Sequence, residues 1–483
     1  MLHRSPRIAI LGGGITGLAA AQRLTELAAG SLEWCLFEST ARLGGVLQTV
    51  QEGDWRIELS ADNFLTREPW ARDLCHRVGL AEALLDTNTD RRGAYLVHRG
   101  RLVPVPPGFV LMSASPLWPT IASPLLSPLG KLRLLAEPLM PRGRQQGEPD
   151  ESVADFARRR LGPQALERLV QPLVGGIYTA DPERLSMAAT LPQFLEQEAQ
   201  HGSLWRAALR RARTAVTPVG TGRKEAGANY ALFQAPAAGM QQLVDAVVGR
   251  LPAERLYTGV EIARCERQQN GWRLIDAMGQ VRGDFAAVII TLPAYAAAAT
   301  LPAGTLADEL RRIEYASSSV VCLGVRDEQI TRPMNGFGFV TPAREGRRLI
   351  AASFSSYKFP GRAPAGHTLI RVFVGGALQP ELAELEEPAL LQLVQEELGE
   401  LIGLRGVPIL TRIVRWPRRM PQYHVGHLQR VDRIEQLARE YGGLHLAGAA
   451  YRGVGVPQCV HAGQLAAEQA SAELAQQAPA TGA

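Results

Sequence analysis

The chain has 483 residues, of which 46% are hydrophobic and 20% are charged. This length predicts about two to four domains with an ample apolar core, which excludes a small disulfide-stapled scaffold and a disordered chain. The 52 basic and 47 acidic residues give a net charge of +5 that no basic block concentrates, so we expect no nucleic-acid partner.

The cysteines indicate a reducing compartment. There are 5 of them, an odd number, and none has the C-x-x-C spacing of metal or redox sites. We therefore expect buried, reduced thiols and a cytoplasmic protein. Residues 1–7 carry charges and lead directly into a short apolar run, without the pattern of a signal peptide. Histidines and carboxylates do not cluster at metal-ligand spacing, so we expect no metal.

The clearest local motif lies near the N-terminus. Residues 8–11 form an apolar run typical of a buried strand in a parallel sheet, and a helical pattern follows from residue 18. In the G-x-G-x-x-G turn between them, Gly12 permits a tight turn, Gly14 lets the backbone approach a pyrophosphate, and Gly17 lets the helix pack closely. The expected dinucleotide contacts are Gly12, Gly13, Gly14, Ile15, Thr16 and Gly17.

A second strand and turn support this motif. Residues 32–37 predict the next strand, and Glu38 follows Gly17 by 21 residues, where an acid accepts hydrogen bonds from adenosine ribose and disfavours NADP. The alternative for Glu38 is a solvated strand end. The glycine pair that follows is similar to the second dinucleotide motif of glutathione-reductase-like flavoproteins, which implies FAD. The expected contacts are Glu38, Ser39, Arg42, Gly44 and Gly45.

The other end of the chain carries a matching pattern. Residues 444–448 predict a short strand, and Val456 and Pro457 open an alanine-rich helix whose N-terminus would direct positive partial charge at the flavin pyrimidine. Residues 451–453 offer no thiol where amine oxidases tether their flavin, so we expect one non-covalent FAD per chain. Both chain ends would meet around it, with contacts from Gly448, Gly455, Val456 and Pro457.

Two uncharged stretches resemble membrane spans. Residues 102–130 contain seven prolines, which a helix cannot accommodate, so we expect no span there. Two interpretations stay open for them: a surface that dips into lipid or roofs an apolar tunnel, and a proline-rich loop packed on its own protein. Residues 285–291 predict a buried strand, which Pro293 separates from an alanine-rich helix.

Three middle segments have simpler patterns. Residues 148–168 show helical periodicity, with Ser152 and Asp155 as a capping pair at its start. Residues 213–229 are polar and contain glycine, as a connector would. Residues 258–262 alternate like a strand.

Four further segments resemble the oxygen-dependent porphyrinogen oxidases of haem synthesis, which comprise protoporphyrinogen oxidase and coproporphyrinogen III oxidase within the flavin monoamine oxidase-like superfamily. They are IELSADNF (57–64), QPLVGGIYTADPERLS (171–186), FSSYKFPGRAP (354–364) and WPRRMPQYHVGH (416–427). The second and fourth are the most specific, because amine oxidases and carotenoid desaturases of the same fold do not usually carry them. The resemblance extends from about residue 6 to residue 470.

The resemblance implies an α/β fold with a Rossmann-like FAD-binding domain, a mixed-sheet substrate domain and a helical lobe. The discontinuous FAD-binding domain takes 1–90, 230–300 and 430–475, the helical, membrane-contacting lobe 91–212, the connector 213–229, the substrate-binding domain 301–429, and a flexible tail 476–483.

It also implies the chemistry. A porphyrinogen loses six electrons to flavin and O2, yielding a porphyrin and hydrogen peroxide, and the product passes to a ferrochelatase-type enzyme. The flavin carries the redox step, so no side chain is assigned as catalytic, although a proton-accepting role for Tyr423 or His427 is a hypothesis.

The resemblance implies particular contacts. Arg91 or Arg92 would hold a propionate, Gly175 would leave room for the ring, and Phe359 would stack on a pyrrole. The alternatives are a helix C-terminal glycine at 175 and an ordinary core phenylalanine at 359. The further cofactor contacts are Ala61, Asp62, Asn63, Val260 and Trp416, with Val260 placed against the adenine through its backbone.

Two rival functions keep parts of this pattern. Another flavin oxidase of the superfamily, acting on amines or polyenes, would retain the cofactor residues and lose the substrate assignments. A non-catalytic protein using the nucleotide fold as a scaffold would purify without flavin. The choice between coproporphyrinogen III, with four propionates, and protoporphyrinogen IX, with two, stays open, as do the oligomeric state and the depth of membrane contact.

Overall fold

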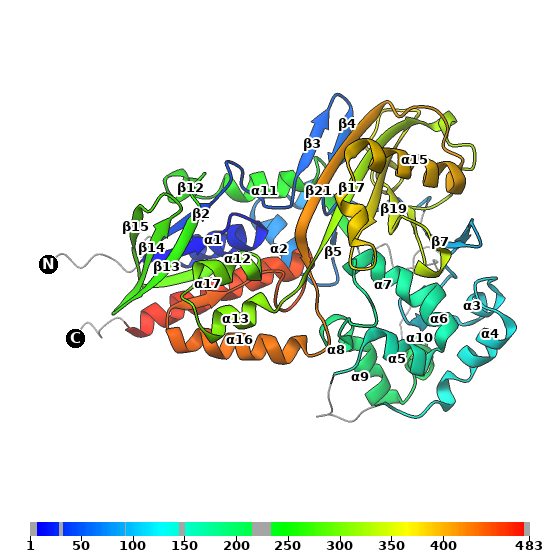
Figure 1. The fold of residues 1–483 in the computed structure, drawn as a ribbon, viewed down its shortest axis with the longest axis horizontal. Helices are drawn as coiled ribbons and strands as arrows, with labels where there is room; N and C mark the ends of the chain where they lie inside the picture. Colours follow the sequence, from blue (N-terminus) through cyan, green and yellow to red (C-terminus); the bar gives the residue numbers. More distant parts are fainter. Residues whose placement is uncertain (1–6, 29–31, 92, 144–149, 215–232, 478–483) are drawn as a thin grey trace.

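The computed structural model describes residues 7–28, 32–91, 93–143, 150–214 and 233–477, with backbone only for 211–214 and 477. Most of the expected connector and the end of the expected tail therefore lie outside the described residues. Figure 1 shows a sheet-and-helix body that carries both chain termini, a second sheet beside it, and a group of helices below that second sheet.

The body is built on a five-stranded parallel sheet. Its strand order is β12-β2-β1-β16-β22, and all four neighbouring pairs are parallel. The central strands are apolar on both faces, as expected of a sheet covered on both sides, and every residue of β16 is buried. The strands are β1 Arg7–Leu11, β2 Glu33–Glu38, β12 Leu256–Thr258, β16 Ala287–Ile290 and β22 Leu444–Leu446.

Helices and a small sheet cover the two faces. One apolar core joins the sheet to α1 Ile15–Ala28, α2 Trp70–Arg77, α11 Met240–Val248 and α17 Val456–Gln477. A second core joins it to α12 Ala294–Thr300, α13 Thr305–Arg311 and α16 His427–Tyr441, and to the antiparallel sheet of β13 Ile262–Gln268, β14 Gly271–Asp276 and β15 Val281–Phe285.

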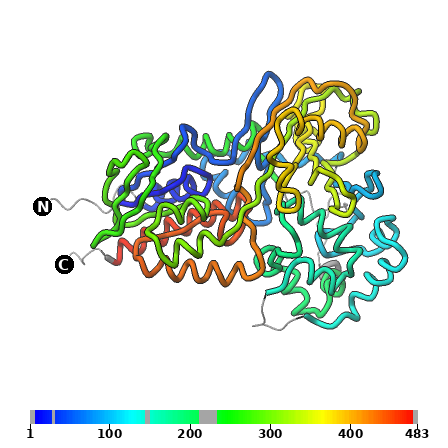
Figure 2. The backbone as a smooth tube through the Cα atoms, viewed as in Figure 1, coloured from blue at the N-terminus to red at the C-terminus, as the bar shows by residue number. Residues whose placement is uncertain are grey.

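The two ends of the chain meet in this body. A Cβ on Gly463 of α17 would lie 2.1 Å from the Thr16 carbonyl oxygen, so the backbones of α1 and α17 cross in close contact. Arg23 of α1 also pairs with Glu468 of α17 at 2.7 Å. Figure 2 shows the corresponding blue and red segments together. The first and last helices of the chain thus pack against each other, as the sequence prediction of one shared site requires.

A mixed seven-stranded sheet lies beside the body. Its order is β21-β17-β20-β19-β18-β7-β8, and only β18 and β7 run parallel. The helix α15 Glu387–Ile402 packs its leucines on one face. The strands are β7 Ala94–His98, β8 Arg101–Pro104, β17 Tyr315–Arg326, β18 Gly338–Val340, β19 Ala351–Phe354, β20 His367–Gly375 and β21 Leu410–Pro421. β7 and β8 fall within 91–212, which we expected to be helical.

The helical lobe has its own apolar core. Ser152 caps α5 by accepting a hydrogen bond from the Asp155 N–H at 2.9 Å, as predicted. The helical pattern predicted for 148–168 is confirmed from Val153 onward, but in two pieces, because Gly162, at φ 95°, ends α5 and the next helix begins at Pro163. The helices are α3 Trp118–Ala122, α4 Pro128–Leu135, α5 Val153–Arg160, α6 Pro163–Ala165, α7 Gln171–Tyr178, α8 Met187–Thr190, α9 Pro192–His201 and α10 Leu204–Thr214.

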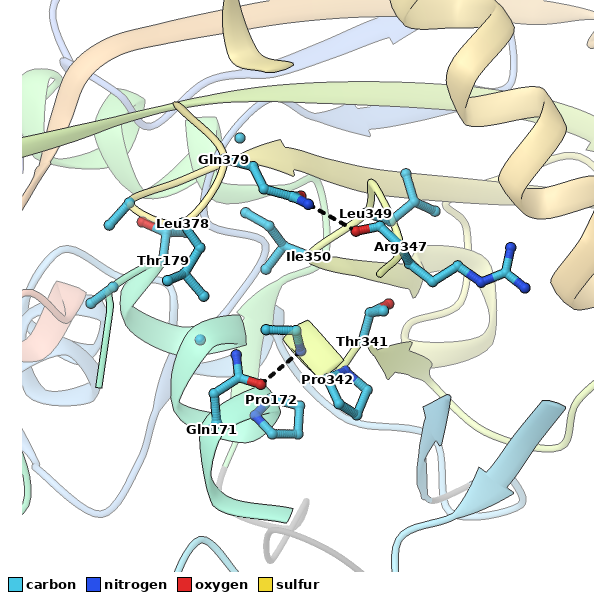
Figure 3. A pocket seen from close by; sticks show the side chains of 15 residues that line it. Gln171, Pro172, Thr179, Thr341, Pro342, Arg347, Leu349, Ile350, Leu378 and Gln379 are labelled. Carbon is cyan, nitrogen blue, oxygen red and sulfur yellow. Dashed lines mark hydrogen bonds between the residues drawn. The ribbon is translucent and has the colours of Figure 1, made fainter. Parts of the chain in front are cut away.

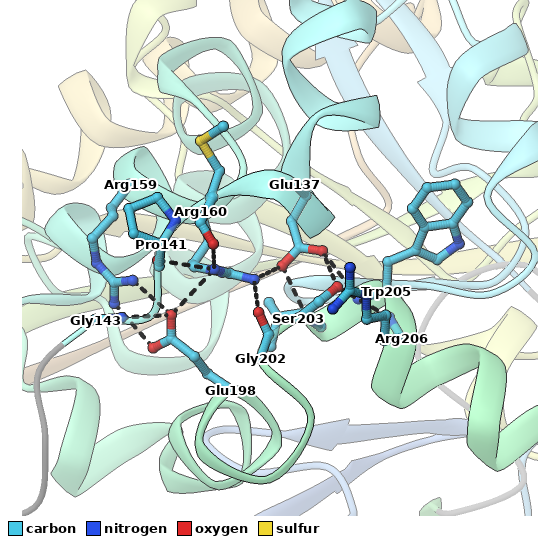
Figure 4. Close-up of polar contacts among 12 residues, drawn as sticks. Glu137, Pro141, Gly143, Arg159, Arg160, Glu198, Gly202, Ser203, Trp205 and Arg206 are labelled. Atoms are coloured by element: carbon cyan, nitrogen blue, oxygen red, sulfur yellow. Dashed lines mark hydrogen bonds and ion pairs between the residues drawn. The ribbon is translucent and has the colours of Figure 1, made fainter.

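A buried ion network ties the lobe together (Figure 4). Arg160 of α5 is fully buried and pairs with Glu137, which precedes α5 in the chain, and with Glu198 of α9. Glu137 also accepts hydrogen bonds from Ser203 and from the Leu204 N–H at 2.9 Å. The network therefore fixes several helices relative to one another.

The small elements complete the fold. The expected strand through 258–262 is wrong: β12 ends at Thr258 because Gly259 takes φ 69°, and β13 begins at Ile262. The other elements are β3 Thr49–Glu52, β4 Trp55–Glu58, β5 Phe64–Leu65, β6 Leu84–Asp86, β9 Phe109–Val110, β10 Ser113–Ala114, β11 Phe233–Pro236 and α14 Ser355–Lys358.

The cysteines and the uncharged stretches are the last features predicted from the sequence. All five cysteines are buried and unpaired, as predicted. Within the described ranges, none of the helices combines the length and apolarity needed to cross a bilayer. Residues 102–130 form short strands and the helices α3 and α4, separated by proline turns.

Candidate functional site

The first glycine turn has the shape that its sequence predicts. Gly12 takes φ 105°, and the Thr291 hydroxyl braces the turn by donating to the Leu11 and Gly12 carbonyls at 2.9 and 3.0 Å. A Cβ on Gly17 would lie 1.9 Å from the Gly12 carbonyl oxygen, so only glycine allows α1 to start this close to the strand.

The second glycine turn lies directly against the first. Gly44 forms a parallel bridge with Gly14, and its N–H donates to the Gly13 carbonyl at 2.7 Å. A Cβ on Gly14 would meet only the Gly45 Cα, at 4.0 Å, so the space beside Gly14 is open. Because the first N–H groups of a helix lack acceptors within the helix, this opening at the start of α1 fits an anionic pyrophosphate.

The acidic residue predicted for the ribose ends β2 beside this cradle. One oxygen of Glu38 accepts from the Gly13 N–H at 2.8 Å, and the other accepts from the Thr40 N–H at 2.8 Å and from the Ser39 hydroxyl. The Thr40 hydroxyl also lies 2.8 Å from that second oxygen, so the capacity for a sugar hydroxyl lies on the oxygen that faces Gly13. The Val260 N–H donates to the Glu38 main-chain carbonyl at 2.9 Å, which fixes Val260 beside the end of β2.

Arg42 supports the second turn. Its guanidinium donates to the Leu43 and Leu47 carbonyls, both at 2.9 Å, and to the Gly45 carbonyl. Burial lowers the pKa of Arg42, although Glu38 opposes the shift. Arg42 thus shapes the turn that carries Gly44 and Gly45.

Asp62, between Ala61 and Asn63, belongs to a buried ion cluster. Lys358 contacts the Asp62 carboxylate at 3.1 Å and Arg371 contacts it at 3.2 Å. Burial alone would raise the pKa of Asp62, but these two cations outweigh it and lower the pKa to about 2. Asp62 is therefore an ionised anchor for its segment. Trp416 of β21 fixes the chain two residues before Ala61, because its indole N–H donates to the Leu59 carbonyl at 2.8 Å.

The C-terminal contacts lie on the turn between β22 and α17. Gly448 takes φ 127°, and a Cβ there would lie 3.8 Å from the Thr16 hydroxyl, so this turn borders the start of α1. Val456 and Pro457 open α17, as predicted, directly after Gly455. The structure thus brings together the two glycine turns and the start of α17.

The predicted substrate residues lie in different surroundings. Arg91 is exposed, and its guanidinium stacks 4.1 Å above the Tyr357 ring. Arg92 lies outside the described residues. Phe359 is 1% exposed and packs beside Lys358 and Arg362, at 5.7 and 5.6 Å from its ring centre, so its neighbours are cations within the core.

Gly175 lines a cavity of about 260 Å³ between α7 and the seven-stranded sheet (Figure 3). It lies inside α7, which ends at Tyr178 with Thr179 in the left-handed region at φ 48°. The alternative of a helix C-terminal glycine is therefore wrong. The cavity has amide, hydroxyl and aliphatic walls, and its lining includes Gln171, Thr341, Leu349, Ile350 and Gln379.

Sequence reasoning missed several supporting residues. Thr291 is one of them, although its position after an apolar strand and before Pro293 marks a turn. Lys358, Arg371 and the buried pair Glu58 and Arg362 were also missed. Only the concentration of charges in otherwise apolar segments could have signalled them.

Two facing glycine turns on a parallel sheet covered on both sides define a dinucleotide-binding protein of the flavoprotein type. The family model described as flavin containing amine oxidoreductase matches residues 15–471, and the chain belongs to that family. Family membership makes a flavin the cofactor, and the α/β fold predicted from the sequence is confirmed.

Individual relatives are similar along nearly their whole length. The chain is 33% identical over 467 residues to coproporphyrinogen III oxidase of Bacillus subtilis (strain 168), covering 96% of this chain and 97% of that one. It is 27% identical to protoporphyrinogen oxidase 2 of Arabidopsis thaliana, covering 96% and 93%. A crystal structure from Exiguobacterium sp. 255-15, provisionally described as a protoporphyrinogen oxidase, matches with a TM-score of 0.85 and 30% identity, covering 98% and 100%.

Proposed function

We propose that this protein is an FAD-dependent porphyrinogen oxidase of haem biosynthesis, with coproporphyrinogen III as its preferred substrate. The observation that carries the proposal is the 33% identity to a coproporphyrinogen III oxidase over nearly the full length of both chains, which exceeds the 27–28% to the plant protoporphyrinogen oxidases. In the reaction, three O2 accept six electrons and six hydrogens from one porphyrinogen, giving one porphyrin and three hydrogen peroxide.

Bound non-covalently, one FAD per chain would supply the redox chemistry by accepting hydride from a bridge carbon of the porphyrinogen. The protein's own residues would hold and orient the cofactor. The cradle of Gly14 and Gly44 would take the pyrophosphate, Glu38 the ribose, and the Val260 carbonyl the adenine. The start of α17 would place positive partial charge near the flavin pyrimidine. Cys459 is buried inside α17, which supports a dissociable cofactor.

At the substrate, three residues have separate roles in this proposal. Arg91 is exposed and would pair with a propionate, since a guanidinium matches a carboxylate bidentately. Gly175 would leave space where a side chain would intrude. Phe359, buried beside Lys358 and Arg362, would support the wall of the substrate site from behind. We also propose that the substrate-binding domain includes β7 and β8, because both strands belong to its mixed sheet. The helical lobe would then begin near residue 105.

Competition between the two porphyrinogens tests the substrate. We expect coproporphyrinogen III to be oxidised with a kcat/KM at least about tenfold above that of protoporphyrinogen IX, because it offers four propionates to a cationic anchor such as Arg91 where protoporphyrinogen IX offers two. Porphyrin fluorescence and oxygen consumption measure both reactions, with spermidine as the amine control. If the protein oxidised spermidine and neither of the two porphyrinogens, the result would contradict the proposal.

The helical lobe supports peripheral contact with lipid. Trp118, Leu129, Leu132 and Leu139 are 73%, 76%, 62% and 79% exposed, and all lie on α3, on α4 or just after α4. Apolar side chains on short surface helices, with Lys131 among them, suit the boundary of an anionic bilayer. We place the protein in the cytoplasm at the membrane surface, where five reduced thiols persist and a ferrochelatase-type enzyme can receive the product.

Vesicle sedimentation tests this contact. The wild-type protein is expected to pellet with vesicles that contain phosphatidylglycerol, and the variant Trp118→Ser with Leu132→Ser and Leu139→Ser is expected to stay in solution. Val407→Ser is the control, because Val407 is 82% exposed but lies near α15, away from the lobe. Wild-type protein that remains wholly in the supernatant would remove the membrane proposal.

A further inference from the structure

One turn of the chain contacts three parts of the molecule. Residues 421–427 lead from β21 of the seven-stranded sheet to α16 of the body. Their backbone binds the segment before α8 in the lobe: the Ser186 N–H donates to the Tyr423 carbonyl at 2.7 Å, and the Val425 N–H donates to the Arg184 carbonyl at 2.8 Å. The side chains of Tyr423 and His427 reach a different segment.

These side chains hold residues 449–453, the turn that leads from β22 to α17. The Tyr423 hydroxyl donates to the Ala449 carbonyl at 2.6 Å and accepts from the Gly453 N–H at 2.8 Å. His427 Nε2 lies 2.8 Å from the Tyr451 carbonyl oxygen. The two rings stack at 3.9 Å between centres and 13° between planes. Three backbone groups of one short turn thus depend on one stacked pair.

The pair is unsuited to proton transfer at neutral pH. Tyr423 is 1% exposed and His427 is 4% exposed. Burial raises the pKa of Tyr423 and lowers the pKa of His427 to about 4, so both side chains are neutral. A neutral histidine that faces a carbonyl oxygen must carry its proton on that nitrogen, so His427 donates from Nε2. The hypothesis that either residue accepts a proton from substrate finds no support in these contacts.

We propose that Tyr423 and His427 are positioning residues, which fix the 449–453 turn and thereby the start of α17 toward the flavin. The inference rests on the proposed role of Gly448 and Val456 in binding that cofactor. The pair also connects the helical lobe to the proposed flavin site. Residues 421–427 bind Ser186 of the lobe through the Tyr423 backbone, and they bind Ala449 and Gly453 through the Tyr423 side chain.

Tyr423→Phe tests the first half of the pair. The substitution keeps the stacked ring and removes only the hydroxyl, so it leaves the Ala449 carbonyl and the Gly453 N–H without this partner. Because two hydrogen bonds are lost beside the cofactor, we expect the Kd of the apoprotein for FAD to rise about tenfold. The flavin absorption bands should shift, and kcat should fall while the KM for porphyrinogen stays near the wild-type value. Tyr441→Phe, at the other end of α16, is the matched control.

A histidine series tests the second half. His427→Phe keeps a ring but loses the donor, so it should weaken FAD binding, whereas His427→Gln restores an N–H donor and should recover most of the affinity. Wild-type FAD affinity and an unchanged flavin spectrum in both Tyr423→Phe and His427→Phe would overturn the inference. Titration of apoprotein with FAD needs no porphyrinogen, so wild-type protein that binds FAD but oxidises no porphyrinogen would remove the proposed function alone.

Discussion

Gly14→Ala is expected to abolish tight FAD binding while the apoprotein keeps its melting temperature. A Cβ at this position would meet only the Gly45 Cα, at 4.0 Å, and Gly14 lies outside the left-handed region, so the apoprotein tolerates the methyl group. The methyl group would instead occupy the space proposed for the pyrophosphate. A phosphate held away from the N–H groups of this turn would lose charge-assisted hydrogen bonds, so we expect the Kd to rise about a hundredfold.

Gly17→Ala provides the contrast, because its clash lies within the protein. The added Cβ would lie 1.9 Å from the Gly12 carbonyl oxygen, and this contact exists with or without FAD. We expect the apoprotein itself to lose about 3 kcal/mol of unfolding free energy, as overpacked sites do. Flavin fluorescence titration gives the Kd, and thermal unfolding of the apoprotein gives the stability. An unchanged FAD affinity in Gly14→Ala would show that the pyrophosphate does not bind beside Gly14.

The cofactor half of the site was predictable because its signals are local. A buried strand, a tight turn and a helix start occur within residues 7–28, so Gly12, Gly14 and Gly17 could be assigned roles from spacing alone. The meeting of the chain ends was predictable for a different reason. Parallel strands need partners from elsewhere in the chain, and residues 444–446 supply one beside β16.

The ion cluster under Asp62 could not be predicted in the same way. Its members come from residues 58–62 and 358–371, and nothing in either segment indicates that the other lies opposite. Helix and strand ends were also predicted poorly where a single glycine decides them. Gly162 and Gly259 both take positive φ, and this choice depends on the tertiary packing around each residue.

The substrate half was less predictable because exposure depends on the whole fold. A phenylalanine that stacks on a ligand and one that packs in a core have the same sequence pattern, and Phe359 is buried beside two cations. Likewise, Arg91 could be seen as a cation but not as the partner of Tyr357, which lies more than 250 positions later in the sequence. Side-chain direction, and not residue type, separates these cases.

Arg160→Met is expected to destabilise the protein by about 3 to 5 kcal/mol, because it leaves Glu137 charged and buried without its main partner. Arg160 is fully buried and donates to the Met140, Pro141 and Gly202 carbonyls at 3.1, 3.2 and 2.9 Å. Methionine keeps much of the side-chain volume, so the loss of unfolding free energy reports the charge and the hydrogen bonds of Arg160. Urea unfolding followed by tryptophan fluorescence measures the change.

The neighbouring Arg158 gives the control within the same helix. Its pairs with Asp155 and Glu183, at 2.9 and 2.5 Å, lie at the surface, and 42% of its side chain is exposed. Surface ion pairs contribute about 0 to 1 kcal/mol, so Arg158→Met should unfold close to the wild-type midpoint. Equal effects of the two substitutions would show that helix charge, and not the buried network, determines the stability of the lobe. A large effect confined to Arg160 would instead mean that the network holds α5, α9 and the segment around Glu137 in place, and with them α4, whose Arg133 donates to the Arg160 carbonyl at 3.2 Å.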